Sequence, residues 1–502
     1  MGFAGYALMS GHRNRKVRRA AGAAAAIAVT AVSAGPLPAA QAASHGPLTS
    51  HGPLIRVAGS PDTASTDSRA APAFPGCAWP VETTPATANV AAPDPYATYW
   101  TTPFRASPHD SITITGVYPT SRFMSFAVYN DSFQLFSNTV HGKSVPSDLS
   151  DYQINANRGS RNPWRTGRVS RHRAFTVRLR PQVTAERQHA ANAIPMIDQN
   201  PPTDPAGPPG LGYVIFRTYI PAGGNTAVRL PAITITRNGH STTLRPCTRP
   251  DRVTAGPDAA RTGMTAAAAN SPGAGRHSSV PALQYFGPSA ASAAGLFPNP
   301  VNAYLIMEFT PEKGYVVVTH GKAPTSPVQA GHGVPGNTIG ASPVPWIRPG
   351  YQVRYWSIAN YLNAQPYPVV KVGRGSRAVY GGTPDYLTTL RNGYYTVVSS
   401  LPADKPSAAS LKASAATWIP TSASRPGSPE FQLLRNMLSQ QALYPEGFTF
   451  IPPPASPEDD IPPATVRQHM GAYYPQTARC TVQTFESSGW AGCLAAFSRA
   501  GR

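Results

Sequence analysis

Proline and glycine are frequent enough in this chain to argue against long helices. The 502 residues include 56 prolines and 43 glycines. Proline removes a backbone donor and clashes with the preceding helical turn, and glycine costs about 1 kcal/mol relative to alanine inside a helix. Short runs of Val, Ile, Thr and Tyr alternate with clusters of Pro, Gly, Asn and Ser. This pattern predicts short strands joined by turns, and therefore an all-β protein.

The N-terminus has the three parts of a secretory signal peptide. A basic segment, residues 13–19, precedes an apolar stretch at 20–34, and Ala40-Gln41-Ala42 fits the cleavage pattern. The apolar stretch is shorter than the roughly 20 strongly apolar residues of a membrane span. We expect residues 1–42 to be removed on export and the mature chain to have no transmembrane segment. An uncleaved N-terminal anchor is the alternative.

Composition divides the mature chain into four parts. Residues 43–73 contain little apolar mass, which predicts a disordered tether. Residues 74–249 contain strand-like runs and form the first expected β-sandwich domain. Residues 250–282 have few large apolar side chains and are expected to be a linker. Residues 283–502 form the second expected β-sandwich domain, with a proline-rich C-terminal region. The expected strands are 111–116, 122–129, 174–179, 212–220, 232–237, 303–309, 315–319, 351–358 and 394–399.

The two expected domains share the order of their short motifs. The paired segments are 116–119 (GVYP) with 321–324 (GKAP), 122–130 (RFMSFAVYN) with 352–360 (QVRYWSIAN), and 175–178 (FTVR) with 395–398 (YTVV). We therefore predict two tandem antiparallel β-sandwich or jelly-roll modules related by duplication. The alternative is that two unrelated β-domains share short aromatic and β-branched runs.

The chain has four cysteines, an even number that predicts disulfides in an exported protein. Four cysteines allow three pairings. Cys77 and Cys247 bracket the first domain, and Cys480 and Cys493 close a short loop near the C-terminus, so we expect these two pairs. A structural zinc site is the alternative, but CxxC spacing and nearby histidines are missing.

The formal net charge is +20, and part of the excess is concentrated in one segment. Residues 155–180 contain no Asp or Glu. Guanidinium groups suit bidentate contacts with phosphates and carboxylates. We predict an exposed polyanion-binding loop over residues 158–173, with a solvated basic surface as the alternative. The predicted binding residues are Arg158, Arg161, Arg165, Arg168 and Arg171.

Motifs of established enzyme classes are missing from the sequence. It contains no G-x-S-x-G, no H-E-x-x-H and no Walker or dinucleotide fingerprint. Asp131, Asp148, Asp151 and Glu308 lie near strand ends and are candidates for a glycosidase pair. Solvated turn acids are the simpler interpretation. Asp151, Asn155 and Asn157 offer oxygen ligands for calcium, but without EF-hand spacing, so we expect no metal and no cofactor.

Aromatic residues raise the question of a sugar-binding platform. Tyr99-Trp100 and Tyr355-Trp356 belong to strand-like runs and are expected to pack in the core. Trp164 stands in a polar, arginine-rich stretch and is the best candidate for stacking on a sugar ring.

Segments of the chain resemble known proteins. A family of uncharacterised exported actinobacterial proteins has recurring segments similar to 116–129, 151–164, 320–325, 352–357 and 394–402. The second domain resembles a jelly-roll domain of unknown function from cell-envelope proteins, through 355–358, 394–402 and the Trp-Ile-Pro turn at 418–420. The next expected strand, 431–438, has apolar spacing that fits a helix equally well. These resemblances imply an exported β-protein and no particular activity.

These observations predict a secreted or cell-envelope binding protein without catalytic activity. Its expected partner is an anionic cell-wall polymer or a glycan, and no nucleic acid is expected. An extracellular carbohydrate hydrolase and a purely structural secreted protein are the alternatives. Two acids that converge in a cleft would favour the hydrolase.

Overall fold

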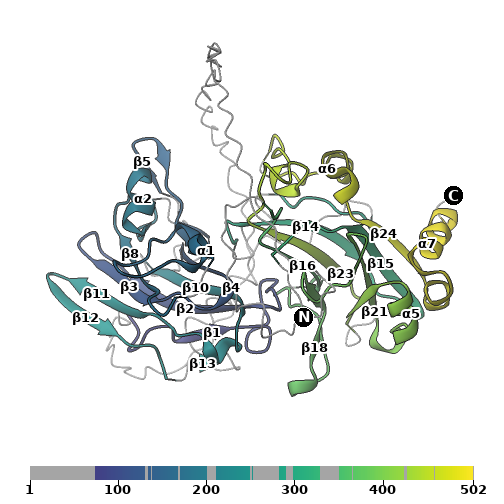
Figure 1. The fold of residues 1–502 in the computed structure, drawn as a ribbon, viewed down its shortest axis with the longest axis horizontal. Coiled ribbons are helices and arrows are strands. Elements are labelled where there is room, and N and C mark those ends of the chain that lie inside the picture. The colour runs from purple at the N-terminus through teal and green to yellow at the C-terminus, as the bar shows by residue number, and fades with distance from the viewer. Residues whose placement is uncertain are drawn as a thin grey trace, which may run out of the picture. The chain divides into compact units, whose positions relative to one another are not determined.

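Two sheets form the first half of the structure, residues 74–252, and enclose one hydrophobic core (Figure 1). Their strand orders are β13-β1-β2-β10-β4-β7 and β12-β11-β3-β8-β9. The strands are β1 (Val81–Thr83), β2 (Ala97–Arg105), β3 (Ser111–Val117), β4 (Ser121–Asn130), β7 (Asp148–Ser150), β8 (Ala174–Arg180), β9 (Ala193–Pro195), β10 (Leu211–Pro221), β11 (Ala232–Arg237), β12 (His240–Leu244) and β13 (Asp251–Arg252). Strand β8 alternates, with Phe175, Val177 and Leu179 in the core, as expected for a strand with one buried face.

Two further sheets form the second half, residues 282–500. Their strand orders are β14-β23-β16-β19 and β20-β21-β15-β24, and β22 pairs with β21. The strands are β14 (Asn302–Phe309), β15 (Tyr315–Lys322), β16 (Tyr355–Leu362), β19 (Gly382–Pro384), β20 (Leu390–Arg391), β21 (Tyr394–Ser400), β22 (Ala416–Pro420), β23 (Glu430–Met437) and β24 (Gln476–Thr481). Two small hairpins, β5 (Thr139–Val140) with β6 (Lys143–Ser144) and β17 (Lys371–Val372) with β18 (Val379–Tyr380), lie outside these sheets.

The computed structural model describes only part of the chain. The described residues are 74–130, 134–136, 138–167, 170–199, 211–248, 251–252, 282–289, 298–327, 350–364, 366–422, 427–456 and 458–500. The expected signal peptide and tether, and most of the expected linker, lie outside these residues. Residues Ala70–Arg502 form one compact unit, so contacts between its two halves are part of the fold. The all-β architecture predicted from the sequence is confirmed.

The two halves repeat the same strand pairings in the same chain order. In one sheet, β2-β10-β4-β7 corresponds to β14-β23-β16-β19, with every pair antiparallel. In the other, β3 pairs with β8 and β11 as β15 pairs with β21 and β24, and the parallel pair β8–β9 corresponds to β21–β22. Helices α2 (Ala185–Ala191) and α5 (Ala408–Ala413) occupy equivalent connections. The predicted internal repeat is therefore confirmed in the topology.

Equivalent residues follow from the strand register. Gly116 lies opposite Phe175, and Gly321 lies opposite Tyr395. A Cβ atom at either glycine would meet the aromatic ring across the strand pair, at 3.0 Å from Phe175 and 2.6 Å from the Tyr395 hydroxyl. The same close approach of backbone to ring is therefore built into both halves, as the pairing of these two motifs predicts. The predicted pairing of 122–130 with 352–360 was wrong by two residues, because the register matches 122–130 to 354–362.

Both expected disulfides are present, Cys77–Cys247 and Cys480–Cys493. The first joins the two ends of the first half, where the Ala78 backbone also bridges to Pro246. The second fastens α7 (Val482–Ala500) to strand β24.

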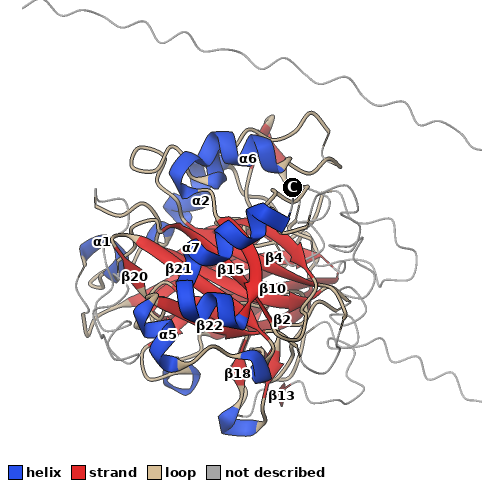
Figure 2. Cartoon of the chain, turned by 90° about the vertical axis from the view of Figure 1, so that its right-hand side faces the viewer, coloured by secondary structure: helices blue, strands red, loops and turns tan. Residues whose placement is uncertain are grey.

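Helices are confined to connections and to the C-terminal region, as Figure 2 shows. α7 contains no proline, so the local sequence permits a long helix, and the backbone is interrupted only at Gly489, where φ is +58°. The described residues also include α6 (Pro463–Met470) and the short α1 (Pro163–Thr166). The ambiguous segment 431–438 forms strand β23, fully buried along its length. No helix in the described ranges combines the length and apolar character of a membrane span.

One segment of the first half packs on the second half. Between β1 and β2, the backbone amides of Ala91 and Ala92 donate to the carbonyls of Pro366 and Tyr367. The Asn89 side chain donates to the Val369 carbonyl and accepts from its amide, both at 2.8 Å. Residues 84–96 therefore form an arm that reaches across the boundary between the two halves.

Candidate functional site

Two buried ion pairs join the halves in a reciprocal way. Arg122 of β4 contacts Asp385 at 2.7 Å, and Arg354, just before β16, contacts Asp151 at 2.8 Å. The register makes Arg122 equivalent to Arg354, and Asp151 equivalent to Asp385. All four side chains are at most 4% exposed. Each half thus supplies the cation for the other half's carboxylate, and no net buried charge is left.

A third buried arginine, Arg435 of β23, is paired with a carboxylate, although its Nε has no hydrogen-bond partner among the described residues. Its Nη1 donates to Asp94 of the arm at 2.7 Å, and its guanidinium lies 5.3 Å from the centre of the Tyr304 ring. The Asp94 carboxylate also accepts from the hydroxyls of Tyr355 and Ser357, at 3.0 Å and 2.9 Å. This charge is therefore neutralised within the fold.

Arg217 of β10 is the equivalent of Arg435 in the first half. Arg217 lies between Tyr99 and Ser125 in the register, just as Arg435 lies between Tyr304 and Ser357. Its guanidinium is 5.3 Å from the centre of the Tyr99 ring. The residue types around the two arginines are therefore the same on both neighbouring strands.

The equivalent of Asp94 in the second half is Asn299. The backbone carbonyl of each residue accepts from the amide three residues later, and the side-chain oxygen of each accepts from the amide two residues later. The duplicated position therefore carries a carboxylate beside Arg435 and a neutral amide on the side of Arg217.

Arg217 is consequently a buried cation with an incomplete set of partners. It is 2% exposed, and its Nη2 donates to the Tyr129 hydroxyl at 2.9 Å. Its Nε and Nη1 find no hydrogen-bond partner among the described residues, and neither does the Asn299 Nδ2. A buried donor without a partner costs about 1–3 kcal/mol, and more when it is charged.

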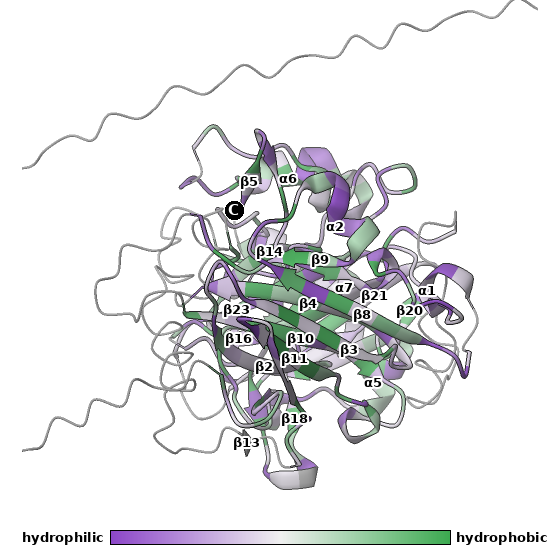
Figure 3. Ribbon diagram, turned by 90° about the vertical axis from the view of Figure 1, so that its left-hand side faces the viewer, coloured by the Kyte–Doolittle hydropathy of each residue, from purple (hydrophilic) through white to green (hydrophobic). Residues whose placement is uncertain are grey.

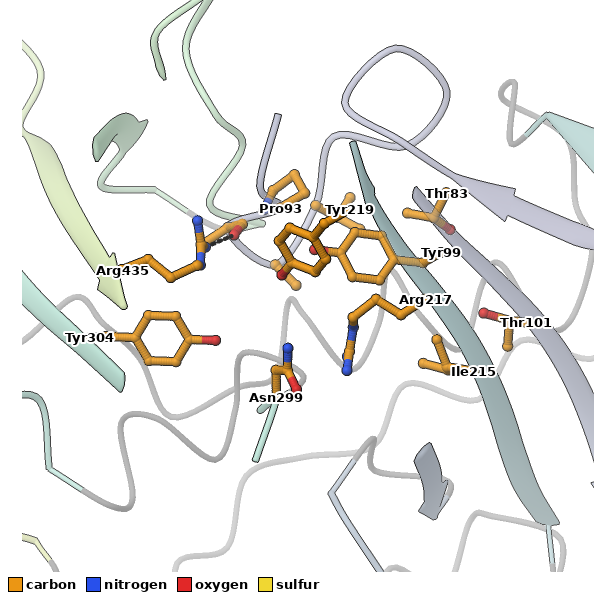
Figure 4. A pocket seen from close by; sticks show the side chains of 13 residues that line it. Thr83, Pro93, Tyr99, Thr101, Ile215, Arg217, Tyr219, Asn299, Tyr304 and Arg435 are labelled. Carbon is orange, nitrogen blue, oxygen red and sulfur yellow. Dashed lines mark hydrogen bonds between the residues drawn. The ribbon is translucent and has the colours of Figure 1, made fainter. Parts of the chain in front are cut away.

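A pocket opens beside Arg217, Asn299 and the neutralised Arg435 (Figure 4). It encloses about 550 Å³ of unfilled space, part of which is open to solvent. In Figure 4 the Arg217 guanidinium and the Asn299 amide point into the same space. The lining consists of Thr83, Val90, Ala91, Ala92, Pro93, Tyr99, Thr101, Ile215, Arg217, Tyr219, Asn299, Tyr304 and Arg435. None of these described residues is an acid, and the site is suited to hold a negatively charged group.

Asp148 of β7 is a buried acid whose pKa is influenced by Arg217. Burial raises the pKa of Asp148 to about 6, and Arg217 opposes part of that shift. No ion pair joins the two side chains in the described part of the structure. Burial opposes the charge of Arg217, but the surrounding oxygens of Tyr129, Tyr219 and Tyr99 outweigh it and hold the pKa above its ordinary value. Arg217 therefore remains a cation.

The comparisons with known proteins found similarity to solved structures alone. No protein-family model matches the chain, and no curated protein matches it. An uncharacterized protein from Burkholderia cenocepacia is 13% identical, with 81% of this chain and 82% of that chain covered and a TM-score of 0.43. The VPA0106 protein from Vibrio parahaemolyticus is 10% identical, with 70% and 87% covered and a TM-score of 0.32. Neither likeness carries an argument about function.

The predicted arginine loop is only partly an exposed loop. Arg158, Arg161, Arg165 and Arg171 are exposed, and Arg168 lies outside the described residues. Arg165 is bound within the fold, because its guanidinium donates to the carbonyls of Tyr152 and Gln153 and to the Asn155 side chain. The segment also forms the short helix α1. Polyanion binding by the other exposed arginines stays a prediction.

Trp164 is not a sugar platform, and this expectation was wrong. Its side chain is fully buried, with the indole N–H donating to the Arg122 carbonyl and the ring edge-on to Tyr118. Asn162 caps α1 through its side chain, and this turn directs Trp164 into the core in spite of the arginines around it.

The candidate carboxylates that the structure describes do not line the pocket. Asp148 of β7 and Asp151, directly after that strand, are buried, and Glu308 accepts from the Asn363 side chain in the second half. Asp131 lies outside the described residues. Asp151 is no free calcium ligand either, because its oxygens accept from Arg354 and from two backbone amides.

Arg217 and Arg435 were not among the residues predicted from the sequence, although a signal was present. Both interrupt strongly apolar runs, GYVIFRTYI and FQLLRNML, which form the central strands β10 and β23. Figure 3 shows how hydrophobic β4 and β10 are along most of their length. An arginine within such a strand must be buried, so it needs a counter-charge or a function.

Proposed function

We propose that this protein binds, outside the cytoplasm and without catalysing a reaction, a ligand whose anionic group contacts Arg217. The observation that carries the proposal is a buried guanidinium, two of whose nitrogens lack a partner among the described residues, beside a pocket. Charge-assisted hydrogen bonds between a guanidinium and an anion are short and strong.

The energetics of the fold support a bound anion. Each of the other buried arginines, Arg122, Arg354 and Arg435, contacts a carboxylate. Removing one partner of a buried ion pair lowers the free energy of unfolding by about 3–5 kcal/mol, so a buried arginine without a carboxylate destabilises the fold. The Tyr99 ring and the Tyr129 hydroxyl compensate for part of that cost. A ligand anion would compensate for the rest.

The compartment is part of the proposal. Both disulfides fit an oxidising environment, and the N-terminal sequence has the features of an export signal. In the cell envelope, the ligand would be an acidic unit of a glycan or of an anionic cell-wall polymer. The pocket would take one such unit, while the exposed Arg158, Arg161 and Arg171 would contact further charges of a polymer.

A carbohydrate hydrolase is the less favoured function. Glycosidases need two carboxylates about 5–10 Å apart around the bond that is cleaved. The described lining of the pocket offers arginine, tyrosine, threonine and asparagine, which bind an anion and a hydroxylated ligand rather than attack a glycosidic bond.

The test is anion binding by the mature protein and by Arg217→Met. Isothermal titration calorimetry at low salt, with a panel of acidic and neutral sugars, should find an acidic ligand for the wild type and none for the variant. Removing a buried charge that lacks a carboxylate should not lower Tm by more than a few degrees, because replacing buried ionic groups by apolar ones is often neutral. Equal binding by both proteins would refute a role for Arg217.

A further inference from the structure

We propose that the anionic group is the carboxylate of a hydroxylated acid, for example a sugar acid, and that it balances the charge of Arg217 as Asp94 balances the charge of Arg435. This inference rests on the proposed function and names the chemistry of the ligand. The two halves of the molecule support it, because Arg435 contacts a carboxylate, whereas Arg217 has the same tyrosine and serine neighbours and contacts none among the described residues.

The two arginine environments match in their geometry. Each guanidinium lies 5.3 Å from the centre of a tyrosine ring on a neighbouring strand, Tyr99 of β2 or Tyr304 of β14. Each arginine is paired on its other side with a serine, Ser125 or Ser357. The Ser357 hydroxyl donates to Asp94 at 2.9 Å, whereas the Ser125 hydroxyl has no partner among the described residues. The surroundings of Arg217 therefore keep donors without a partner where the second half has the Asp94 carboxylate as an acceptor.

The number of donors and the charge favour a carboxylate. The donors without a partner beside this charge in the pocket lining are the Nε and Nη1 of Arg217 and the Nδ2 of Asn299. A carboxylate has roughly four lone-pair positions and can accept from all three. Arg435, the other cation of the pocket, is already neutralised by Asp94. A single uncompensated cation favours a group with one negative charge over a doubly charged phosphate.

The rest of the lining favours hydroxyl groups on the ligand. The buried hydroxyls of Thr83 and Thr101 line the pocket and lack partners in the described structure. Tyr99, Tyr219 and Tyr304 also border it, so polar oxygens and ring edges are mixed around the space. A compact acid with several hydroxyls satisfies these groups, and a fatty acid does not.

The first experiment compares three probes on the full mature protein by calorimetry at low salt. D-glucuronate, D-glucose 6-phosphate and D-glucose share a hexose ring and differ in the charged group. We expect D-glucuronate to bind at least tenfold more tightly than D-glucose 6-phosphate, and D-glucose to give no signal. Tighter or equal binding of the phosphate would overturn the carboxylate assignment and leave the proposed function standing. Binding of neither anion would overturn both.

The second experiment fills the site from within. Asn299→Asp places a carboxylate where Asp94 stands in the other half, so it should weaken D-glucuronate binding at least tenfold without lowering Tm. Asn299→Ala is the matched control, because it removes the amide without adding charge and should weaken binding less than Asn299→Asp does. If Asn299→Asp binds D-glucuronate as the wild type does, Asn299 and Asp94 are not functional equivalents and the inference is wrong.

Discussion

Arg217 and Arg435 occupy equivalent places in the two halves, and one side chain decides how they differ. Asp94 supplies a carboxylate to Arg435, and its equivalent Asn299 supplies an amide on the Arg217 side. The difference between Asp and Asn is one atom and one charge, and in a buried environment that charge is worth several kcal/mol. At this scale a change of a single residue type turns a structural ion pair into a candidate binding site.

The buried Asp148 should make the stability of the protein depend on pH. Its pKa is raised by burial from an ordinary 3.8 to about 6, so the folded protein binds this proton more tightly than the unfolded chain. The stabilising effect of the proton is fully present below about pH 4 and is lost as the pH rises through 6. For this one group the loss is about 2–3 kcal/mol. Asp148→Asn should remove this part of the pH dependence.

Urea denaturation of both proteins at pH 4.5 and pH 7.5 measures this effect. The variant should gain stability relative to the wild type at the higher pH, and the difference should shrink at the lower pH. A constant difference between the two proteins at both pH values would show that Asp148 titrates normally in the folded state.

At this scale, contacts between residues far apart in the sequence were the hardest to predict. The separation of Cys77 and Cys247 was interpretable because disulfides have a chemistry of their own. Asp94 and Arg435 are 341 residues apart and are brought together only by the arm. Trp164 was misjudged because its neighbours in sequence are polar while its neighbours in space are Tyr118 and Arg122.

At the scale of elements, strands were predicted well where apolar and polar residues alternate. The predicted strands 111–116, 174–179 and 232–237 lie within a residue or so of β3, β8 and β11. Buried strands without alternation were ambiguous, since β23 has an apolar spacing that also fits a helix. The helix α7 was not expected, because the average composition concealed a proline-free segment.

Gly321 supports a prediction about how β15 packs against β21. Its missing Cβ leaves room for the Tyr395 hydroxyl, which would be 2.6 Å from that atom. Tyr395 is 1% exposed and has no room to withdraw, so Gly321→Ala should lower the free energy of unfolding by about 1–3 kcal/mol. Gly116→Ala is the matched variant and should cost less, since its Cβ would be 3.0 Å from the Phe175 ring.

Tyr395→Phe provides the rescue. The Tyr395 hydroxyl lacks a hydrogen-bond partner in the described structure, so its removal should cost little and should recover much of the loss caused by Gly321→Ala. Thermal unfolding of the four proteins gives the coupling energy directly. Strictly additive effects would mean that the alanine strains some other contact.

At the scale of the whole molecule, the two halves depend on each other. The reciprocal pairs Arg122–Asp385 and Arg354–Asp151 lie within the contact between the halves and are almost completely buried. The arm of residues 84–96 adds backbone hydrogen bonds to the second half. The sequence indicated two similar modules. It could not indicate that they depend on each other, because each ion pair joins one residue from each half.

Arg354→Gln should therefore destabilise both halves together. The change leaves the Asp151 carboxylate buried with only backbone amides as partners, which should cost about 3–5 kcal/mol. Arg122→Gln is the equivalent variant and should have a similar effect through Asp385. Hydrogen exchange monitored on peptides from β10 and β23 should show both losing protection in one cooperative step. Retained protection in β10 while β23 exchanges would show that the halves unfold independently.

The reciprocal ion pairs have the symmetry of a contact between two identical subunits. The arginine of each half contacts the aspartate of the other half. Such an exchange of equivalent contacts is typical of a two-fold symmetric dimer. A lone module would leave its own arginine and aspartate without counter-charges. The arrangement is the one that a symmetric homodimer of a single module would form, here with both copies carried on one chain. On one chain the two copies need not be identical, and one position holds Asp94 while its counterpart holds Asn299.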